Sequence, residues 1–345
     1  MKDRIEPPKE IDFLLTSECN LRCKHCHMWM NKDSDRSLSL NEKKDVIRQF
    51  SDLNRHGRVV FCGGELMLKK EEFLELTLLC NELGVMSLAV TNGALIDKQD
   101  CERILSAEPD ILVFSLDSHK SEVHDWIRGQ KGAFDRAVKS IEVLIELRKK
   151  LSGKKTKIYL SQVLMDRNIG DIESFVDYSM ALGVDGVRFQ GLLPTFSSYS
   201  KVGKDSFFEK NFFTDEELAI REIKGVKEKH DANSFVLNSR SDFEWMEDSV
   251  FLKGRDTGAP QCGAFYKTIY LDQEGNYSLC PNAHLFASKF NYPGKKEHSA
   301  DRVQNLGNFR EMGLEEFWYG NRARDARVLM SDCKKICGIT PELRK

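Results

Sequence analysis

Between about residue 10 and residue 193, continuous apolar stretches alternate with stretches whose apolar residues recur at helical spacing. Short apolar runs between polar segments are typical of strands buried on both faces of a parallel sheet. Ser39, with Glu42 three residues later, predicts a capped helix start. A second helix is predicted where Phe134, Val138 and Ile141 recur at helical spacing. The predicted strands are Ile11–Thr16, Arg58–Cys62, Met86–Thr91, Ile111–Leu116, Lys157–Met165 and Gly186–Leu192.

Six successive strand–helix units predict an α/β fold, a partial (β/α)6 TIM-like barrel covering residues 1–193. Residues 194–259 are polar and rich in phenylalanine, and we expect a helical bridge there, with Thr214 as the N-cap of a helix. From residue 260 to 345 the pattern predicts a small α+β domain that contains a hairpin. Sites of such barrels gather where the strands end.

Composition sets limits on function. The chain has 345 residues, 41% of them hydrophobic, and a formal net charge of -2, which gives no electrostatic footprint for nucleic acid or an anionic membrane. No stretch has the form of a signal peptide or reaches the ~20 apolar residues of a membrane span. We therefore expect a cytoplasmic protein with no nucleic-acid or membrane partner. In that compartment, ten cysteines favour metal or redox sites over disulfides.

Three of these cysteines, Cys19, Cys23 and Cys26, follow the first predicted strand with the spacing Cys-x3-Cys-x2-Cys. Thiolates bind Fe–S clusters and zinc, and both usually take four ligands. Three local thiols leave one position for a distant residue or a substrate. Three of four zinc ligands, or buried thiols that happen to cluster, are the alternatives.

The spacing and position of this motif resemble those of radical S-adenosylmethionine (radical SAM) enzymes. The resemblance implies a 4Fe–4S cluster on Cys19, Cys23 and Cys26, with its fourth iron chelated by SAM. It also implies that His25 packs near the adenine and that Gly63-Gly64-Glu65 holds the SAM amino group. Leu66 follows this motif, where the family usually has proline.

Further cofactor contacts are expected at the ends of later strands. The predicted residues are Asn92, Ser115, Asp117 and Arg188, and the candidates for catalysis are Arg188 and Gln190. An ordinary turn or a satisfied polar residue in the core is the alternative at each of them. In the run His124-Asp125-x2-Arg128-Gly129, we expect His124 and Arg128 to order the loop. Cys62, Cys80 and Cys101 are interpreted as buried structural thiols, with Cys62 placed to reach the site.

A second cysteine set comprises Cys262, Cys280, Cys333 and Cys337. The segments Lys267–Leu271 and Tyr277–Leu279 predict a hairpin that brings Cys262 and Cys280 together. A helix through Glu315–Phe317 precedes the last two cysteines. Four thiols would suit zinc, but the pattern resembles the SPASM/twitch extension of radical SAM enzymes, which implies one auxiliary 4Fe–4S cluster.

The resemblance implies an oxidoreductase that reductively cleaves SAM to a 5′-deoxyadenosyl radical, which abstracts hydrogen from a substrate. The auxiliary cluster would accept an electron, and flavodoxin or ferredoxin would supply one. The barrel begins within about ten residues of the N-terminus, which favours oxidation of a small polar metabolite such as a sugar or cyclitol. The alternative is a maturase that cross-links a peptide or forms a thioether. A zinc-stabilised binding protein and a two-cluster electron carrier are the alternatives from other classes.

Overall fold

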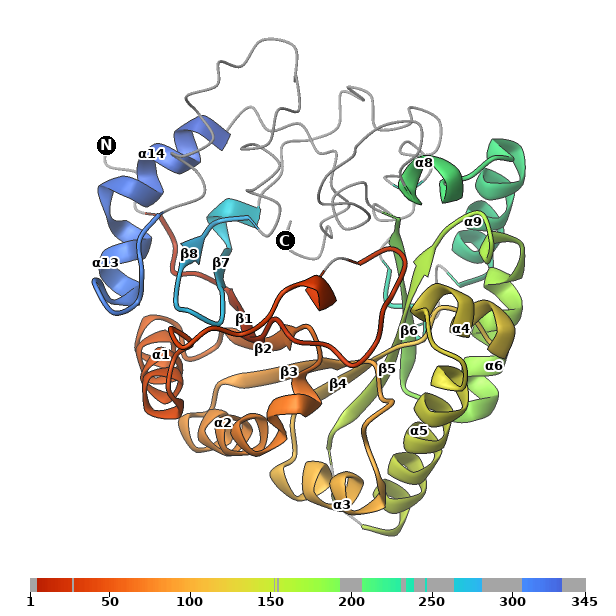
Figure 1. The fold of residues 1–345 in the computed structure, drawn as a ribbon, viewed down its shortest axis with the longest axis horizontal. Helices are drawn as coiled ribbons and strands as arrows, with labels where there is room; N and C mark the ends of the chain where they lie inside the picture. Colours follow the sequence, from red (N-terminus) through yellow and green to blue (C-terminus); the bar gives the residue numbers. More distant parts are fainter. Residues whose placement is uncertain are drawn as a thin grey trace.

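The computed structural model describes residues 5–26, 28–151, 153, 155–192, 207–230, 234–238, 246, 264–280 and 306–330. These residues are organised around an eight-stranded sheet with the order β6-β5-β4-β3-β2-β1-β7-β8 (Figure 1). Neighbouring strands from β6 to β7 are parallel, and β7 and β8 are antiparallel. The strands are β1 (Glu10–Thr16), β2 (Arg58–Gly63), β3 (Met86–Thr91), β4 (Ile111–Ser115), β5 (Lys157–Leu164), β6 (Gly186–Gly191), β7 (Thr268–Leu271) and β8 (Tyr277–Ser278).

Helices α1, α2, α3, α5 and α6 line the outside of the curved sheet (Figure 1). The α-helices are α1 (Leu40–Leu53), α2 (Lys70–Leu83), α3 (Lys98–Ala107), α4 (Ser121–Arg128), α5 (Ala133–Lys150), α6 (Ile172–Leu182), α8 (Phe207–Asn211), α9 (Glu216–His230), α13 (Leu314–Tyr319) and α14 (Asn321–Met330). Short 3-10 turns are η1 (Met28–Met30), η2 (Leu66–Lys69), η3 (Ile169–Asp171) and η4 (Ala264–Tyr266). The predicted α/β class, with a parallel sheet covered by helices, is confirmed.

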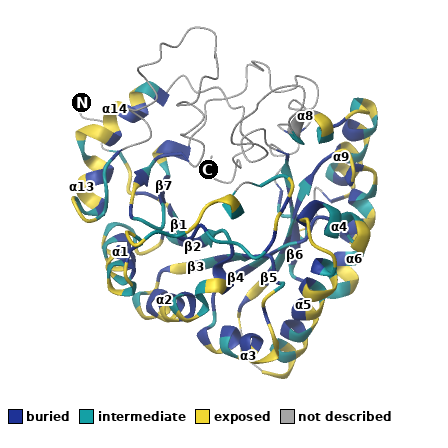
Figure 2. Ribbon diagram, in the orientation of Figure 1, coloured by how far each residue is buried: buried dark blue, intermediate teal, exposed yellow. Residues whose placement is uncertain are grey.

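Burial alternates along the strands, as the two-residue period of a strand requires. Phe13, Phe61 and Phe114 are fully buried in the core. The residues between the buried ones, such as Cys62, Val113 and Ser161, are half-buried and belong to the opposite, concave face of the sheet. Figure 2 shows buried residues along the strands and exposed ones on the outer sides of the helices. The concave face is therefore the part of the sheet available to a ligand.

The ends of the six predicted barrel strands agree with the structure to within one residue. The predicted capping box is present: the Ser39 backbone N–H donates to Glu42 Oε2 at 2.8 Å, and the Glu42 N–H donates to Ser39 Oγ. The predicted cap of α9 was wrong by one residue. Asp215 Oδ1 accepts the Leu218 N–H at 2.8 Å, whereas Thr214 donates its backbone and hydroxyl hydrogens to Asp166.

The predicted hairpin forms as β7 and β8, and β7 pairs with β1 in the barrel sheet. Its turn packs on the segment that follows the cysteines, since the Leu38 N–H donates to the Gln273 carbonyl at 2.8 Å and the Ser34 hydroxyl to Glu274 at 2.6 Å. The helix predicted through Glu315–Phe317 is α13. The division into domains 1–193, 194–259 and 260–345 stays a prediction, and much of the predicted bridge lies outside the described residues.

Within the described part of the chain, no helix combines the length and apolar character needed to cross a membrane.

Candidate active site

The cysteine loop leaves the carboxyl end of β1 and meets the segments that follow β2, β3 and β4. Its start is fixed by Asp33, whose carboxylate accepts the Thr16 hydroxyl at 2.7 Å and the Ser17 N–H at 2.8 Å. Sequence reasoning missed Asp33, because a lone carboxylate in a polar stretch carries no local signal of this contact. The start of the cysteine loop is therefore fixed by a residue that follows the three cysteines in the chain.

Gly63 and Gly64 pack directly against the backbone that enters the cysteine loop. A Cβ atom at Gly63 would lie 2.2 Å from the Thr16 oxygen, and one at Gly64 would lie 2.0 Å from the Glu18 oxygen. Gly63 also has a φ of 139°, which favours glycine. The two glycines therefore permit a close approach of the backbone after β2 to the start of the cysteine loop.

Glu65 is buried, and its carboxylate joins two of these segments. Oε1 accepts from the Met67 N–H at 3.0 Å and from the Thr91 hydroxyl at 2.6 Å, and Oε2 accepts the Asn92 N–H at 2.8 Å. Burial raises the pKa of Glu65, and these hydrogen bonds oppose that shift. Two carboxylate oxygens offer about four acceptor positions, so one position on Oε2 remains for a donor such as an ammonium group.

Asn92 ties the end of β3 to the cysteine loop. Its Nδ2 donates to Asn20 Oδ1 at 2.8 Å, and its Oδ1 accepts the Ala94 N–H at 2.9 Å. The side-chain amide is thus largely occupied by protein groups. Its predicted contact with the cofactor stays a prediction, and the structure adds a role in positioning Asn20.

The segment after β4 forms the opposite wall of the cysteine loop. The Arg22 N–H donates to the Arg128 carbonyl at 3.3 Å, and the Lys24 N–H donates to the Ile127 carbonyl at 2.9 Å. A Cβ atom at Gly129 would lie 2.2 Å from the Arg22 oxygen. The backbone from Ile127 to Gly129 therefore orders the cysteine loop, whereas the roles expected for the His124 and Arg128 side chains stay predictions.

Asp117 and Arg128 form a buried ion pair beside the middle cysteine. Arg128 Nε lies 2.8 Å from Asp117 Oδ2, and Arg128 Nη1 donates to Cys23 Sγ at 3.8 Å. Asp117 Oδ1 accepts the Val163 N–H at 3.1 Å, so both carboxylate oxygens are engaged by the protein. The predicted direct contact of Asp117 with the cofactor stays a prediction. Sequence reasoning missed the contact of Arg128 with a thiol.

Cys23 is buried in a cluster with Leu21 and Ala133, and the partly buried Cys19 and Cys26 pack against this cluster. Burial raises the pKa of Cys19 to about 11 and that of Cys26 to about 12, and each is raised further by the charge of Cys23. Burial also raises the pKa of Cys23, and the guanidinium of Arg128 opposes this shift. Thiolates are stable in such a site when bound positive charge compensates them, and binding a metal then releases their protons. The donor set fits a cationic cluster.

Across the described ranges, no group of three or more His, Cys, Asp or Glu side chains is placed to hold a single metal ion. In a four-iron cluster the cysteines bind different iron atoms, so their sulfurs do not need to converge on one ion.

Two histidines lie close to this group. His25 Nδ1 is buried without a hydrogen-bond partner, and burial lowers the pKa of His25 to about 4. A neutral imidazole with an unused nitrogen fits the predicted place beside a ligand. His124 Nδ1 accepts the Asp117 N–H at 3.1 Å, and burial lowers the pKa of His124 to about 4.

The concave face of the sheet carries the other predicted residues. Ser115 is paired in register with Ser161, and Ser161 with Arg188. All three are half-buried, as is Gln190 farther along β6. Ser115, Arg188 and Gln190 therefore belong to the face that a ligand can reach, and their roles stay predictions.

The concave face also carries Asp12, which sequence reasoning missed. Burial, the largest cause, and the charge of Glu10 raise the pKa of Asp12 well above its usual value, while Arg58 and Arg188 lower it. Burial raises the pKa of Cys62 well above its usual value, and the charge of Asp12 raises it further. A carboxylate inside an otherwise apolar strand was the signal that was available. Cys80 and Cys101 are fully buried, as predicted.

Of the second cysteine set, Cys280 lies within the described residues, and Cys262, Cys333 and Cys337 lie outside them. Cys280 is buried and follows β8, at the open end of the hairpin where η4 leads into β7. The auxiliary ligand set stays a prediction.

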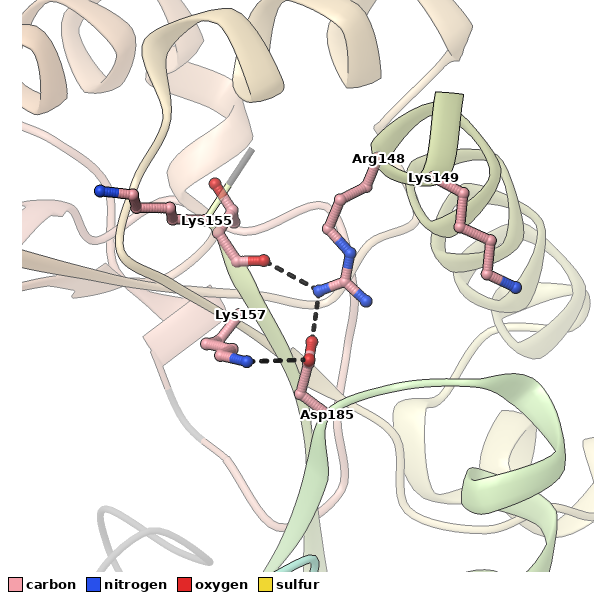
Figure 3. Close-up of a pocket in the computed structure, with 6 residues that line it drawn as sticks. Arg148, Lys149, Lys155, Lys157 and Asp185 are labelled. Atoms are coloured by element: carbon pink, nitrogen blue, oxygen red, sulfur yellow. Dashed lines mark hydrogen bonds and ion pairs between the residues drawn. The ribbon is translucent and has the colours of Figure 1, made fainter. Parts of the chain in front are cut away.

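A pocket of about 460 Å³ lies at the opposite, amino-terminal end of β5 (Figure 3). Three of its charged groups are already paired: Asp185 forms ion pairs with Arg148 and with Lys157, and Arg148 also donates to the Thr156 carbonyl at 2.8 Å. In barrels of this kind, contacts at the amino-terminal ends of the strands stabilise the fold, and active sites lie at the carboxyl-terminal ends. We therefore place the candidate active site at the cysteine loop.

Comparison with known proteins gives one family match, to the radical SAM superfamily over residues 13–176. The chain is 32% identical over 141 residues to the antilisterial bacteriocin subtilosin biosynthesis protein AlbA of Bacillus subtilis, which covers 40% of this chain and 30% of AlbA. It is 28% identical over 189 residues to an AdoMet-dependent heme synthase of Methanosarcina barkeri, covering 54% of this chain and 52% of the synthase. Both matches span about half or less of the relative's own length.

Among solved structures, the fold is similar to that of Streptococcus suis SuiB bound to S-adenosylmethionine. The TM-score is 0.65 with 19% sequence identity, and the superposition covers 98% of this chain and 74% of SuiB. SuiB has also been solved bound to its precursor peptide SuiA. At this identity the likeness establishes the fold.

Proposed function

Because this chain carries a radical SAM domain in residues 13–176, we propose that it is a radical SAM oxidoreductase whose cluster is held by Cys19, Cys23 and Cys26. The match confirms the predicted resemblance for this part of the chain and, with it, the cofactors of the class, a [4Fe–4S] cluster and S-adenosylmethionine. When bound, these groups supply reductive cleavage of SAM and removal of a hydrogen atom from a substrate. The observation that carries the proposal is the desolvated trio of thiols beside Glu65 and Arg128.

Residues in and around the cysteine loop give the cofactor its orientation. Glu65 accepts the SAM amino group through the open position on Oε2, since its other acceptor positions are filled by the protein. His25 packs beside the adenine with its unused Nδ1. Ser115 and Arg188, on the concave face, contact SAM or the substrate from the other side.

For the substrate, we favour a peptide over a small metabolite. AlbA is named for bacteriocin biosynthesis, and SuiB has been solved with a precursor peptide. The heme synthase supports the second candidate, oxidation of a small molecule. In both cases the substrate loses a hydrogen atom and then an electron and a proton. An auxiliary cluster, which Cys262, Cys280, Cys333 and Cys337 would hold, would accept this electron, and a carrier such as flavodoxin or ferredoxin would supply an electron to the first cluster.

SAM cleavage tests the class of reaction. The full chain is reconstituted anaerobically with iron and sulfide and mixed with dithionite and SAM, and 5′-deoxyadenosine is measured by liquid chromatography. We expect release by the wild type and none by the Cys19→Ala, Cys23→Ala, Cys26→Ala triple variant. Cys80→Ala, which removes a buried thiol away from the loop, is the control and should retain release. Cleavage by the triple variant would refute the assignment.

Deuterium transfer tests the substrate class. The enzyme, dithionite and SAM are incubated with extract of cells grown in deuterated medium, after the extract has been separated into a peptide fraction and a small-metabolite fraction. The fraction that holds the substrate places deuterium in 5′-deoxyadenosine, which mass spectrometry detects. Label from the peptide fraction supports the favoured substrate, and label from the metabolite fraction alone supports the second candidate.

A further inference from the structure

The contact between Arg128 and Cys23 places a buried cation on one ligand of the first cluster. Arg128 is 7% exposed, Cys23 6% and Asp117 0%. Arg128 Nη1 donates to Cys23 Sγ at 3.8 Å, while Arg128 Nε faces Asp117 Oδ2 at 2.8 Å. The guanidinium thus contacts both a thiol and a carboxylate, and all three residues are buried.

The side chain of Arg128 is not what docks the loop. The cysteine loop docks on the segment after β4 through two backbone hydrogen bonds. The Arg22 N–H donates to the Arg128 carbonyl, and the Lys24 N–H donates to the Ile127 carbonyl. Gly129 supplies the close contact with Arg22. The guanidinium is therefore an addition to the docking, and it can be replaced without removing these hydrogen bonds.

Reduction of a four-iron cluster adds one electron and hence one negative charge to the site. Hydrogen bonds to ligand sulfurs, net charge and burial set the potential of such clusters. A buried cation that donates to a ligand sulfur stabilises the reduced form more than the oxidised form. A carboxylate behind that cation reduces the effect, because its charge has the opposite sign.

We propose that Arg128 and Asp117 together set the reduction potential of the cluster on Cys19, Cys23 and Cys26, Arg128 raising it and Asp117 limiting the rise. Arg128 is a positioning residue in this sense, acting on the cluster through Cys23. The inference rests on the proposed function and goes beyond it, since it assigns opposite effects to two residues that touch each other. In the cell, the one electron comes from a carrier of the flavodoxin or ferredoxin class.

The test measures the midpoint potential of the cluster in the full, reconstituted chain. Dithionite titrations are followed by electron paramagnetic resonance, and the signal that changes on adding SAM identifies the first cluster. The variants are Arg128→Gln, Arg128→Lys and Asp117→Asn. The matched control is Arg22→Gln, which removes an exposed arginine of the cysteine loop whose guanidinium donates to the carbonyls of Cys19 and Leu21.

In Arg128→Gln, we expect the equilibrium constant for reduction to fall at least tenfold, a shift of about 59 mV to lower potential for one electron. Asp117→Asn should shift the potential the other way, Arg128→Lys should recover most of the wild-type value, and Arg22→Gln should leave it unchanged. A purely structural role would not give shifts of opposite sign. Equal potentials in Arg128→Gln and Arg22→Gln, or shifts of the same sign in Arg128→Gln and Asp117→Asn, would overturn the proposal.

If Arg128→Gln loses its iron, Asp117→Asn decides by itself: a higher potential supports the proposal, and an unchanged one overturns it. The proposed function is judged separately on the wild type. A wild-type chain that cleaves SAM while these variants show no shift leaves the function standing and removes the inference. A wild-type chain without a four-iron cluster removes both.

Discussion

Gly129 lies directly against the backbone of Arg22, so closely that a Cβ atom on residue 129 would come within 2.2 Å of the Arg22 carbonyl oxygen. Gly129 is the C-cap of α4 and has a φ of 68°. The segment after β4 therefore sets the path of the backbone between Cys19 and Cys23, from more than 100 residues away along the chain.

This relationship predicts that Gly129→Ala displaces the cysteine loop. We expect the reconstituted variant to bind less than half the iron of the wild type, because the loop must move away from Arg128 to admit the methyl group. Gly84→Ala is the matched control: Gly84 caps α2 with a φ of 70°, but its Cβ would meet nothing within 4 Å. Both substitutions strain a left-handed residue by about 1 kcal/mol, so equal iron contents would contradict the prediction.

Glu65→Gln should weaken binding of SAM while leaving the cluster in place. The amide group of glutamine cannot accept all three donors that Glu65 accepts, and it removes the negative charge offered to an ammonium group. We expect at least tenfold weaker binding of SAM to the reconstituted protein by isothermal titration calorimetry, with unchanged iron content. Glu71→Gln, at an exposed residue paired with Arg103, is the control. Equal affinities in the two variants would be inconsistent with the role given to Glu65.

The sequence predicted the barrel well because its signals are local. Each strand is a short run of apolar residues, and the Ser39–Glu42 capping box needs only four residues of chain. The same holds for the hairpin around Gly275, whose φ of 87° suits a turn. The misplaced cap of α9 shows the limit of such signals, since Thr214 and Asp215 are both good caps and a contact of Thr214 with distant Asp166 decides between them.

The site was predicted less completely, because its contacts join segments that are far apart in sequence. The motifs after β1 and β2 were recognised, yet the reason for Gly63 and Gly64 is a close approach to Thr16 and Glu18. Arg128 is 105 residues from Cys23. No periodicity or spacing in the sequence indicates that two such distant residues are in contact. Predicting the contact requires knowing which loops meet at the ends of the parallel strands.

The low pKa of His124 predicts a pH dependence of stability. Burial, with the charge of Arg128, lowers the pKa of His124 from 6.5 to about 4, against the attraction of Asp117. The unfolded chain therefore binds a proton at a higher pH than the folded chain does. The contribution of His124 is fully present above pH 6.5 and falls as the pH drops toward 4, by up to about 3 kcal/mol.

The comparison of wild type with His124→Gln isolates this contribution. Glutamine keeps an acceptor near the Asp117 N–H and does not titrate. Urea unfolding of the cluster-free proteins, followed by tryptophan fluorescence from pH 8 to pH 4, should show a steeper loss of stability in the wild type below about pH 6.5. Other groups, including His25, contribute equally to both proteins. Parallel curves would show that His124 is protonated as readily in the folded chain as in the unfolded one.

Cys280→Ala separates the auxiliary cluster from the first one. Cys280 is buried and follows β8 of the β7–β8 hairpin, which is joined to the barrel through the pairing of β7 with β1. If Cys280 binds the second cluster, the anaerobically reconstituted variant should hold about four irons where the wild type holds about eight. We expect it still to cleave SAM, because the cysteine loop is intact, but to lose product formation at least tenfold, because the second electron has no acceptor.

The control is Cys101→Ala, which removes a buried thiol that donates to the Ser140 carbonyl in the core. This variant should keep about eight irons, the content of two four-iron clusters, so a general sensitivity of the fold to losing a thiol is distinguished from loss of a ligand. Colorimetric iron and sulfide analysis provides the count. If Cys280→Ala retains all its iron, or if its zinc content falls instead of its iron content, the second cysteine set does not bind an iron–sulfur cluster, and the zinc interpretation of that set takes its place.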